Sequence, residues 1–362
     1  MLLTRPAAGQ VSRIMIPAGS PEDQALQAIS NEQDAQKRIA LYGEFVGKFP
    51  SSAAAVAYGN WQISQLYLGA GDAAQALAYG DKAVAAMPDN LDLLVSQVTV
   101  AQQMKDNARI VDYAALGGTA FQGIGKQAKP EGMSAEEFES HNNRMREEAR
   151  GNYEYLEGAA YGALAAETNA KKRMSYIERY NAAFPNSRYQ PQVTQYAMIS
   201  LQQMNDRAGV VAFGEKAVAA NPDSVTTLLL LAETMAEDAR TRPKALDYAR
   251  KAVALTQADE SSGDSQKALL AAGAHSVLGF VLVMQGSYDA AIPELKAAAE
   301  PLKNEEAAES RVLYLLGLSY AKLRRYTEAR TYLTQASSIP GPYQRYAHDM
   351  LVQVNALRAK GQ

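Results

Sequence analysis

The side chains best suited to chemistry are few and widely spaced in this sequence. The three histidines are His141, His275 and His348, and none has the two-histidine helical spacing that holds zinc. His275 falls in an expected helix, where a packing or surface histidine is the favoured interpretation. The chain has no cysteine, which excludes disulfides, thiolate metal sites and a cysteine nucleophile. The sequence therefore predicts no metal site.

Glycine-rich and acidic stretches give no better candidate for catalysis. Gly117-Gly118 and Gly123-Ile124-Gly125 lack the preceding strand and the Lys-Ser/Thr ending of a phosphate-binding loop, so a flexible connector is expected. The carboxylates at 136–139 and 147–148 have the spacing of a solvated helix face rather than of a shielded acid–base pair. No Gly-x-Ser-x-Gly motif is present. We expect no catalytic residue, no cofactor and no enzymatic activity.

Composition favours a folded chain of helices. The 362 residues are 47% apolar and 21% charged, and the 14 prolines leave long stretches free to form helix. The net charge of −3 argues against general binding of nucleic acid, which needs a clustered positive field. No run of 18 apolar residues was found, so the sequence predicts no membrane span.

A ten-residue phrase occurs twice in the chain. The stretch from Gly80 to Asp89, GDKAVAAMPD, returns 134 residues later as GEKAVAANPD, from Gly214 to Asp223. A phrase kept in this way indicates an internal repeat. Units that stack on copies of themselves present long surfaces to partners and seldom enclose a reaction. The elements that position any functional residue are thus expected to be repeated helices.

Two units near the C-terminus share a pattern of small, aromatic and proline residues. The first contains Leu278-Gly279, Leu282, Gly286, Tyr288, Ala291, Leu295 and Ala298; the second contains Leu316-Gly317, Tyr320, Arg324, Tyr326, Ala329, Leu333, Ala336 and Pro340. This pattern resembles the tetratricopeptide repeat of bacterial type, a pair of antiparallel helices of roughly 34 residues. The resemblance implies an all-α fold, a right-handed superhelical solenoid of antiparallel helix pairs. It also implies a non-catalytic scaffold for protein–protein interaction.

The resemblance covers roughly residues 20–340 and leaves three segments outside the pattern. We expect an extended N-terminal arm at 1–19, repeats at 20–116, an insertion with an extended helix at 117–150, repeats at 151–340 and a capping helix at 341–362. The arm is either a short edge strand at 11–16 or a loosely docked tail. The insertion either contacts a partner or forms a solvated loop and a helix that begins at the capping-box pattern Ser134 to Glu137.

The family's inner-groove positions lie on the first helix of each unit. On these positions the resemblance places the candidate partner-binding residues Trp61, Gln65, Phe280, Tyr314 and Leu318, together with Leu229, Glu233 and Ser276. Members that hold a C-terminal carboxylate use a set of Lys, Asn and Arg, which this chain lacks. An aromatic and aliphatic groove is expected instead. The alternative is that these rings pack between repeats.

Charge differs between the two ends of the chain. Residues 21–150 hold 17 acids and 11 basic residues, a balance of −6, and residues 311–362 hold 2 acids and 8 basic residues, a balance of +6. Such ends could join head to tail, or the basic end could be a solvated face. The candidate self-association residues are Val11, Ile14, Ile16, Lys322, Arg324 and Arg325.

Two functions from different classes remain open at this point. One is a scaffold that binds a protein or peptide partner, and the other is a structural subunit that assembles with copies of itself. No nucleic acid and no membrane span are expected. An arm without acidic residues resembles a mature N-terminus and favours an exported protein whose signal has been removed, with a cytoplasmic protein as the alternative.

Overall fold

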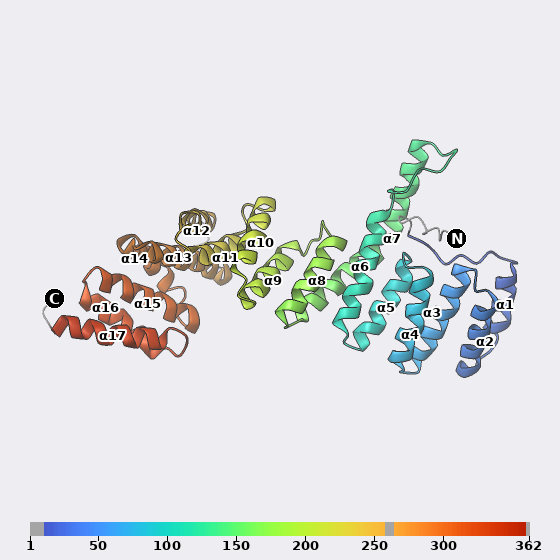
Figure 1. Ribbon diagram of the computed structural model, residues 1–362, viewed down its shortest axis with the longest axis horizontal. Helices are drawn as coiled ribbons and strands as arrows, with labels where there is room; N and C mark the ends of the chain where they lie inside the picture. The colour runs from blue at the N-terminus through green and yellow to red at the C-terminus, as the bar shows by residue number, and fades with distance from the viewer. Residues whose placement is uncertain (1–10, 258–263, 360–362) are drawn as a thin grey trace. The chain divides into compact units, whose positions relative to one another are not determined.

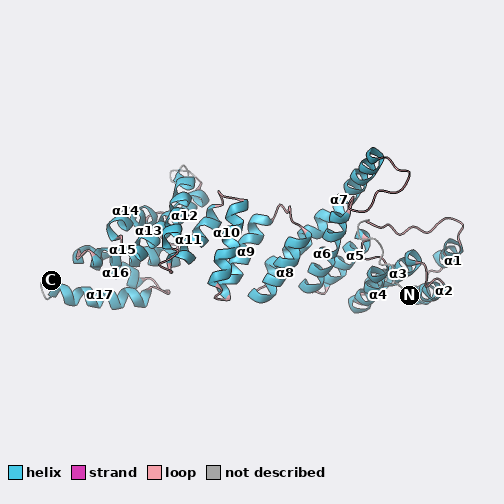
Figure 2. Cartoon of the chain, turned by 45° about the horizontal axis from the view of Figure 1, so that its top comes forward, coloured by secondary structure: helices cyan, strands magenta, loops and turns pink. Residues whose placement is uncertain are grey.

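The computed structural model describes residues 11–257 and 264–359, and within them the chain is all-helical, as expected. Helices account for 77% of the chain, and the described residues contain no strand (Figure 2). Contacts divide the chain into two compact units, Met1–Tyr196 and Ala197–Gln362. The edge strand considered for residues 11–16 is therefore wrong, because residues 11–17 lie in an irregular, unpaired conformation.

Unit 1 is a series of antiparallel helix hairpins (Figure 1). Its helices are α1 (Pro21–Ser30), α2 (Ala35–Lys48), α3 (Ala53–Gly69), α4 (Ala73–Ala86), α5 (Leu91–Gln103), α6 (Asn107–Gly123), α7 (Ala135–Ala166) and α8 (Ala170–Ala183). Helix α3 packs on α4, α4 on α5, and α5 on both α6 and α7. Each helix thus contacts its neighbours in chain order, as a repeat architecture requires.

Unit 2 follows the same plan. Helix α9 (Gln190–Gln203) spans the boundary, and the later helices are α10 (Arg207–Ala220), α11 (Val225–Ala236), α12 (Arg242–Thr256), α13 (Ser265–Gln285), α14 (Tyr288–Ala299), α15 (Glu306–Lys322), α16 (Tyr326–Ser338) and α17 (Gln344–Ala359). The pairs α11–α12, α13–α14 and α15–α16 are packed hairpins, and the first helices α11, α13 and α15 also contact one another in sequence.

One turn geometry closes five of the hairpins. A residue with positive φ follows the first helix at Gly71, Lys105, Asn205, Gly286 and Arg324. The next residue donates its backbone N–H to a carbonyl five positions earlier, at 2.9 Å in all five turns. This bond is that of the Schellman motif, which satisfies carbonyls left open at the helix end. The shared turn shows that these hairpins are copies of one unit.

Missing Cβ atoms allow the two helices of a hairpin to touch. A Cβ built on Gly279 would lie 2.5 Å from Leu295 Cδ2, and one on Gly317 would lie 2.5 Å from Leu333 Cγ. Both leucines are fully buried. The large residue of the second helix therefore packs against the glycine of its own repeat.

The repeated phrase has a related physical basis. A Cβ on Gly80 would collide with the side chain of Gln97, and a Cβ on Gly214 would collide with that of Leu231. In both copies the residue that occupies this space stands 17 positions later, on the first helix of the next repeat. The glycine of the phrase thus sets the spacing between successive repeats.

Gly117 and Gly118 are not part of a connector, contrary to the sequence prediction. They lie inside α6 and are buried. A Cβ on Gly117 would meet Leu156 of α7, and a Cβ on Gly118 would meet Ala183 at the end of α8. These glycines serve close helix packing, which only the tertiary structure reveals.

Helix α13 corrects the expectation that no segment is apolar enough to span a membrane. Ser265–Gln285 has the length and composition of a membrane-crossing helix. However, α13 packs against α12, α14 and α11, and much of its surface is buried in the protein. These contacts are those of the core helix of a repeat.

The C-terminal helix α17 packs on α16 and α15. Its buried side chains are Ala347 and Val354. Tyr346 and Leu357 are 61% and 36% exposed, so the buried face of α17 is narrow.

Candidate functional site

A groove of about 290 Å³ opens on the first helices of unit 2, at the positions where the sequence places a partner. The residues that line this unit 2 groove are Thr226, Leu229, Leu230 and Glu233 of α11, Leu270, Gly273, Ser276 and Val277 of α13, and Leu302, Ala308 and Arg311 at and before α15. Three of the predicted inner-groove residues, Leu229, Glu233 and Ser276, belong to this set. Most of the lining is apolar, which suits the side chains of a protein segment.

Arg311 is the cation of the unit 2 groove. Its Nη1 donates to Glu233, and its guanidinium lies 4.7 Å from the centre of the Phe280 ring. Its Nε is buried and has no hydrogen-bond partner within the described part of the chain. Ion pairing and the aromatic face hold the guanidinium in one orientation. Arg311 can therefore present fixed N–H donors to an occupant, while Glu233 in the same groove balances its charge.

The predicted groove residues of the last repeats lie beside this groove rather than in it. Phe280 supports Arg311 from α13. Tyr314 is half-buried on α15, with its ring 5.6 Å from Tyr343 and 6.3 Å from Tyr346, and burial raises the pKa of its hydroxyl. Leu318 is half-buried one turn further along α15. Tyr314 thus joins the last repeat to the residues of the C-terminal helix and its preceding turn.

Trp61 and Gln65 converge on a single hydroxyl in unit 1. Trp61 Nε1 donates to Ser96 Oγ at 3.2 Å, and Gln65 Nε2 donates to the same oxygen at 2.8 Å. The Trp61 ring also makes an edge contact with Tyr58. Both side chains are half-buried between α3 and α5. They therefore join two neighbouring repeats of unit 1, and only part of their surface is exposed to a partner.

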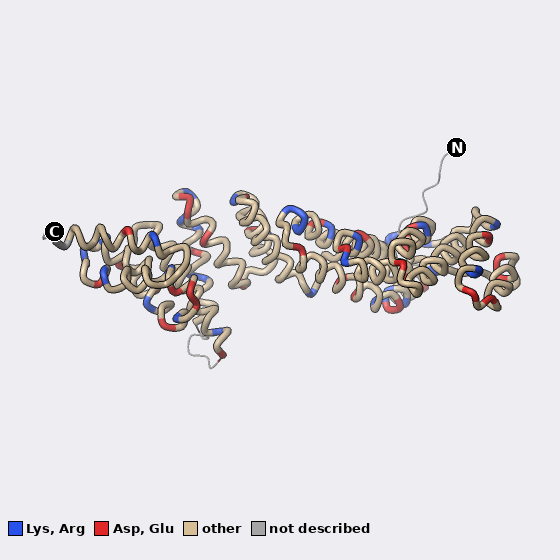
Figure 3. The backbone as a smooth tube through the Cα atoms, turned by 90° about the horizontal axis from the view of Figure 1, so that it is seen from below, with Lys and Arg blue, Asp and Glu red and all other residues tan. Residues whose placement is uncertain are grey.

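The basic candidates for self-association sit at the turn between α15 and α16. Lys322 and Arg324 are exposed. Arg325 is engaged within the chain, because its Nη2 pairs with Glu328 at 2.7 Å and its guanidinium lies 4.7 Å from the centre of the Tyr320 ring. In Figure 3, basic and acidic residues alternate along both units.

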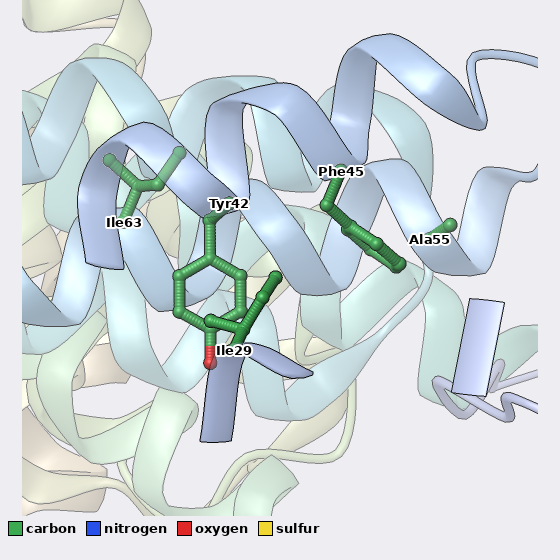
Figure 4. Close-up of a cluster of buried hydrophobic side chains, with 5 residues drawn as sticks. All are labelled: Ile29, Tyr42, Phe45, Ala55 and Ile63. Carbon is green, nitrogen blue, oxygen red and sulfur yellow. The ribbon is translucent and has the colours of Figure 1, made fainter. Parts of the chain in front are cut away.

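The apolar candidates of the N-terminal arm are docked on unit 1. Val11, Ile14 and Ile16 are half-buried. Ile16 packs against a core cluster of α1, α2 and α3, formed by Ile29, Tyr42, Phe45, Ala55 and Ile63 (Figure 4). These arm residues therefore contact their own chain in this structure.

Chemically versatile side chains do not gather in the described residues. No three His, Asp or Glu side chains lie close enough to hold a metal ion in residues 11–257 and 264–359. His275 Nδ1 lies 2.6 Å from Glu294 Oε2, a contact between the two helices of one hairpin.

Arg311 and Leu270 were missed by the sequence reasoning. Both lie on first helices, as the predicted residues do, and Arg311 stands one turn before Tyr314. A signal for Arg311 was present, since it shares a helix face with Tyr314 and Leu318. Its pairing with Glu233, 78 residues earlier, depends on the stacking of units and could not be read from local spacing.

The comparisons with known proteins agree with this geometry. The family model of the tetratricopeptide repeat matches residues 310–341, which contain α15 and α16. The matched residues include Gly317 and Leu333, the pair that closes the hairpin. A search of curated proteins finds no match.

Two solved structures illustrate the distant similarity. The crystal structure of the P58(IPK) TPR domain aligns over 95% of this chain and 99% of its own, with 12% identity and a TM-score of 0.34. The Cut9–Hcn1 hetero-tetramer of APC/C aligns over 92% of this chain and 62% of the other, with 14% identity and a TM-score of 0.45. This chain therefore spans less than two thirds of the latter.

The repeated turn, the glycine–leucine contact and the match at 310–341 all describe the same unit. Residues 310–341 accordingly form a tetratricopeptide repeat, and the preceding hairpins share its turn and its antiparallel pairing.

Proposed function

We propose that this protein is a non-catalytic scaffold that binds a segment of a partner protein in the unit 2 groove. The tetratricopeptide fold suggests a protein-interaction role in general. The observation that carries the specific proposal is an apolar groove on three successive first helices with one oriented cation, Arg311. Such a surface suits a partner with aliphatic side chains for the leucines and a carbonyl or carboxylate for Arg311.

A matched pair of leucines tests this proposal. Leu270 and Leu255 are both 38% exposed, but Leu270 lines the groove and Leu255 lies on α12 outside it. Peptides selected from a random library on the wild-type protein provide defined probes. We expect Leu270→Glu to weaken the selected peptides at least about tenfold, because a charge is placed against apolar partner surface. Leu255→Glu should leave their affinity unchanged.

Isothermal titration of each peptide into the three proteins is the measurement. Equal affinities for the Leu270→Glu and Leu255→Glu proteins would place the binding elsewhere and contradict the proposal. Arg311→Gln supplies a second check, since peptides with an acidic residue should lose affinity more than neutral ones. Urea unfolding of each variant shows whether a loss reflects the groove or the fold.

Self-assembly through the ends is the alternative function. The observation that favours it is the exposed pair Lys322 and Arg324 in a C-terminal segment of charge +6. If copies join through these residues, Lys322→Glu/Arg324→Glu lowers the mass measured by light scattering, and added salt does the same. A mass that stays at one chain for wild type and variant alike would exclude this alternative.

A further inference from the structure

The N-terminal arm, residues 11–17, lies along unit 1 as a bound segment would. Figure 1 shows it leading from the start of α1 back towards α7. Ile16 packs on the core cluster of α1–α3, and further along the arm Ser12 reaches the start of α5 and Arg13 reaches α7. The seven residues of the arm thus contact α1–α3, the start of α5 and α7. Extended segments bound across repeats are a common recognition mode.

Ser12 is hydrogen-bonded through both its backbone carbonyl and its side-chain hydroxyl. Asn90 Nδ2 donates to the Ser12 carbonyl at 2.9 Å, and the Ser12 hydroxyl donates to Asp89 Oδ1 at 2.6 Å. The Asn90 side chain is held firmly, because its Oδ1 accepts the N–H of Leu93 at 2.9 Å as the N-cap of α5. Asn90 is 1% exposed. A buried amide in a fixed orientation can recognise the backbone carbonyl of an extended segment.

The α7 extension forms the opposite wall. Helix α7 has 32 residues, against 17 in α3 and 17 in α15, and its added first turns, residues 135–149, are called the α7 extension. One face of the added turns carries His141, Met145, Glu148 and Ala149 towards the arm. Glu148 pairs with Arg13 at 2.7 Å. A helix of ordinary repeat length would lack this face.

The space between the arm and α7 is only partly filled. A cavity of about 560 Å³ remains there, lined by Val11, Ser12, Arg13 and Met15 of the arm and by Leu91, Asp92, His141, Met145, Glu148, Ala149 and Asn152. Met15 is 74% exposed at this site. The acids at 89, 92 and 148 favour a basic occupant, which Arg13 satisfies in part.

The duplicated block of the chain lacks this site. The residue 134 positions after Asn90 is Ser224, whose hydroxyl lies 2.8 Å from Thr227 Oγ1 and has no amide to offer. The counterpart of Asp89 is Asp223, which pairs with Lys251 at 3.0 Å. The repeat fold therefore does not require these contacts. They belong to the first block, where the arm is.

We propose that the start of α5 and the α7 extension form a second recognition site, which binds an extended partner segment with a hydroxyl residue followed by a basic one. The site consists of Asp89, Asn90, Leu91, Met145 and Glu148. The protein's own arm occupies this site in the structure. A partner segment that displaces the arm would make the same contacts as Ser12 and Arg13. This proposal concerns unit 1 and is independent of the unit 2 groove.

The test uses the full chain with substitutions in the arm only. Ser12→Asp/Arg13→Glu places carboxylates beside Asp89 and Glu148 and releases the arm while the site stays intact. The probe is a fluorescent peptide with the sequence of residues 11–18. We expect it to bind this protein at least about tenfold more tightly than wild type, because the tethered arm no longer competes.

A charge reversal in the site and a neighbouring control complete the design. Adding Glu148→Arg to the arm variant should abolish binding of the peptide. Glu147→Arg is the control, because Glu147 pairs with Arg150 and does not line the cavity. Equal affinity of the peptide for wild type and arm variant would overturn the proposal, and so would equal effects of the two reversals.

The solution mass decides between occupants. If wild type is a concentration-dependent oligomer and the arm variant is a single chain, the site binds the arm of a second copy and the proposal of a foreign segment is overturned. A single chain in both cases supports it. Faster amide exchange of residues 11–17 in the arm variant than in wild type verifies that the arm has been released.

Discussion

Single glycines decide how closely the helices of a repeat approach. Gly279 and Gly273 lie on the same helix, yet only the first faces a side chain that a Cβ would strike. Around Gly273 no atom lies within 4 Å of an added Cβ. The same substitution should therefore have opposite effects at the two sites, since packing opposes it at one and helix propensity favours it at the other.

We predict that Gly279→Ala lowers the free energy of unfolding by about 1–3 kcal/mol, because Leu295 must move. Gly273→Ala should raise that free energy by about 0.5–1 kcal/mol, as alanine favours helix over glycine. Urea unfolding followed by circular dichroism measures both. Destabilisation by both alanines would show that Leu295 is not the cause.

A buried tyrosine links stability to alkaline pH. Tyr113 is 4% exposed, donates its hydroxyl to Asp81 and accepts from Arg109 at 3.2 Å. Burial, with the bond to Asp81 and its charge, raises the pKa of Tyr113 well above its ordinary value of 10.0. The unfolded chain then ionises first. The contribution to stability is complete below pH 10 and is lost as pH rises towards the pKa of the folded state.

For Tyr113→Phe we expect a loss of about 1 kcal/mol at neutral pH, from the lost bond to Asp81. We also expect a shallower fall in stability above pH 10, because one proton-linked group is gone. Unfolding midpoints measured across this range test both effects. Tyr346→Phe, at a 61% exposed position, should leave stability at neutral pH unchanged. An unaltered alkaline slope in Tyr113→Phe would contradict the assignment.

Among the elements, α7 is the one that departs from the repeat. Residues 135–141 at its start are mostly exposed, so they rely on local interactions more than packed helices do. The capping box supplies these. Ser134 Oγ accepts the Glu137 N–H at 3.1 Å, and Glu137 Oε2 accepts the Ser134 N–H at 2.8 Å. These bonds lower the pKa of Glu137 below its ordinary value of 4.5.

Removal of this cap should loosen the start of α7 without unfolding the protein. We predict that Ser134→Ala speeds amide exchange in residues 135–140 and barely alters the global unfolding midpoint. By contrast, Asp72→Ala removes the cap of the packed helix α4, where Asp72 accepts from Gln75 at 3.0 Å, and should lower global stability by about 1 kcal/mol. A global loss in Ser134→Ala as well would show that the extension is coupled to the unit.

Glu137 gives this element a dependence on acid. Its lowered pKa means that the cap contributes fully above about pH 4.5 and is lost as pH falls below that value. Measured relative to α4, amide exchange at 135–140 should therefore become faster on acidification in wild type, because the intrinsic chemistry of exchange slows in both segments while only the start of α7 loses its cap. In Glu137→Gln this pH dependence should be weaker, while the exchange in α4 serves as reference.

Elements that obey local rules were predictable, and those set by tertiary contact were not. The helical pairs followed from the repeated phrase and the small-residue pattern, and the start of α7 followed from Ser134. Gly117-Gly118 was misjudged because a glycine pair has the same local signature in a connector and in a close helix contact. Of the positions that the family pattern predicted, Leu229, Glu233 and Ser276 line the unit 2 groove, whereas Phe280, Tyr314 and Leu318 do not. The fixed orientation of Arg311 could not be predicted from the sequence, because it depends on Glu233 and Phe280 from other repeats of unit 2.

Within each unit, the main contacts between the described helices join neighbours in chain order or helices one removed. In unit 2, α13 contacts α11, α12, α14 and α15, and the contacts of unit 1 follow the same rule. The stability of such a chain is a sum of repeat terms and nearest-neighbour terms. A substitution should therefore lower the stability of its own helix and of the helices that it contacts, and leave distant helices unchanged. A substitution on α13 should alter the unit 2 groove in this way.

Amide exchange of the Gly279→Ala protein tests this locality. We expect faster exchange in α13, α14 and their direct neighbours, where the lost packing between Gly279 and Leu295 lowers the cost of opening. Exchange in α3 to α6 should match that of wild type, and Gly273→Ala should accelerate none of these regions. If Gly279→Ala instead accelerates all helices equally, the protein opens as one cooperative body, and the nearest-neighbour description of its stability is wrong.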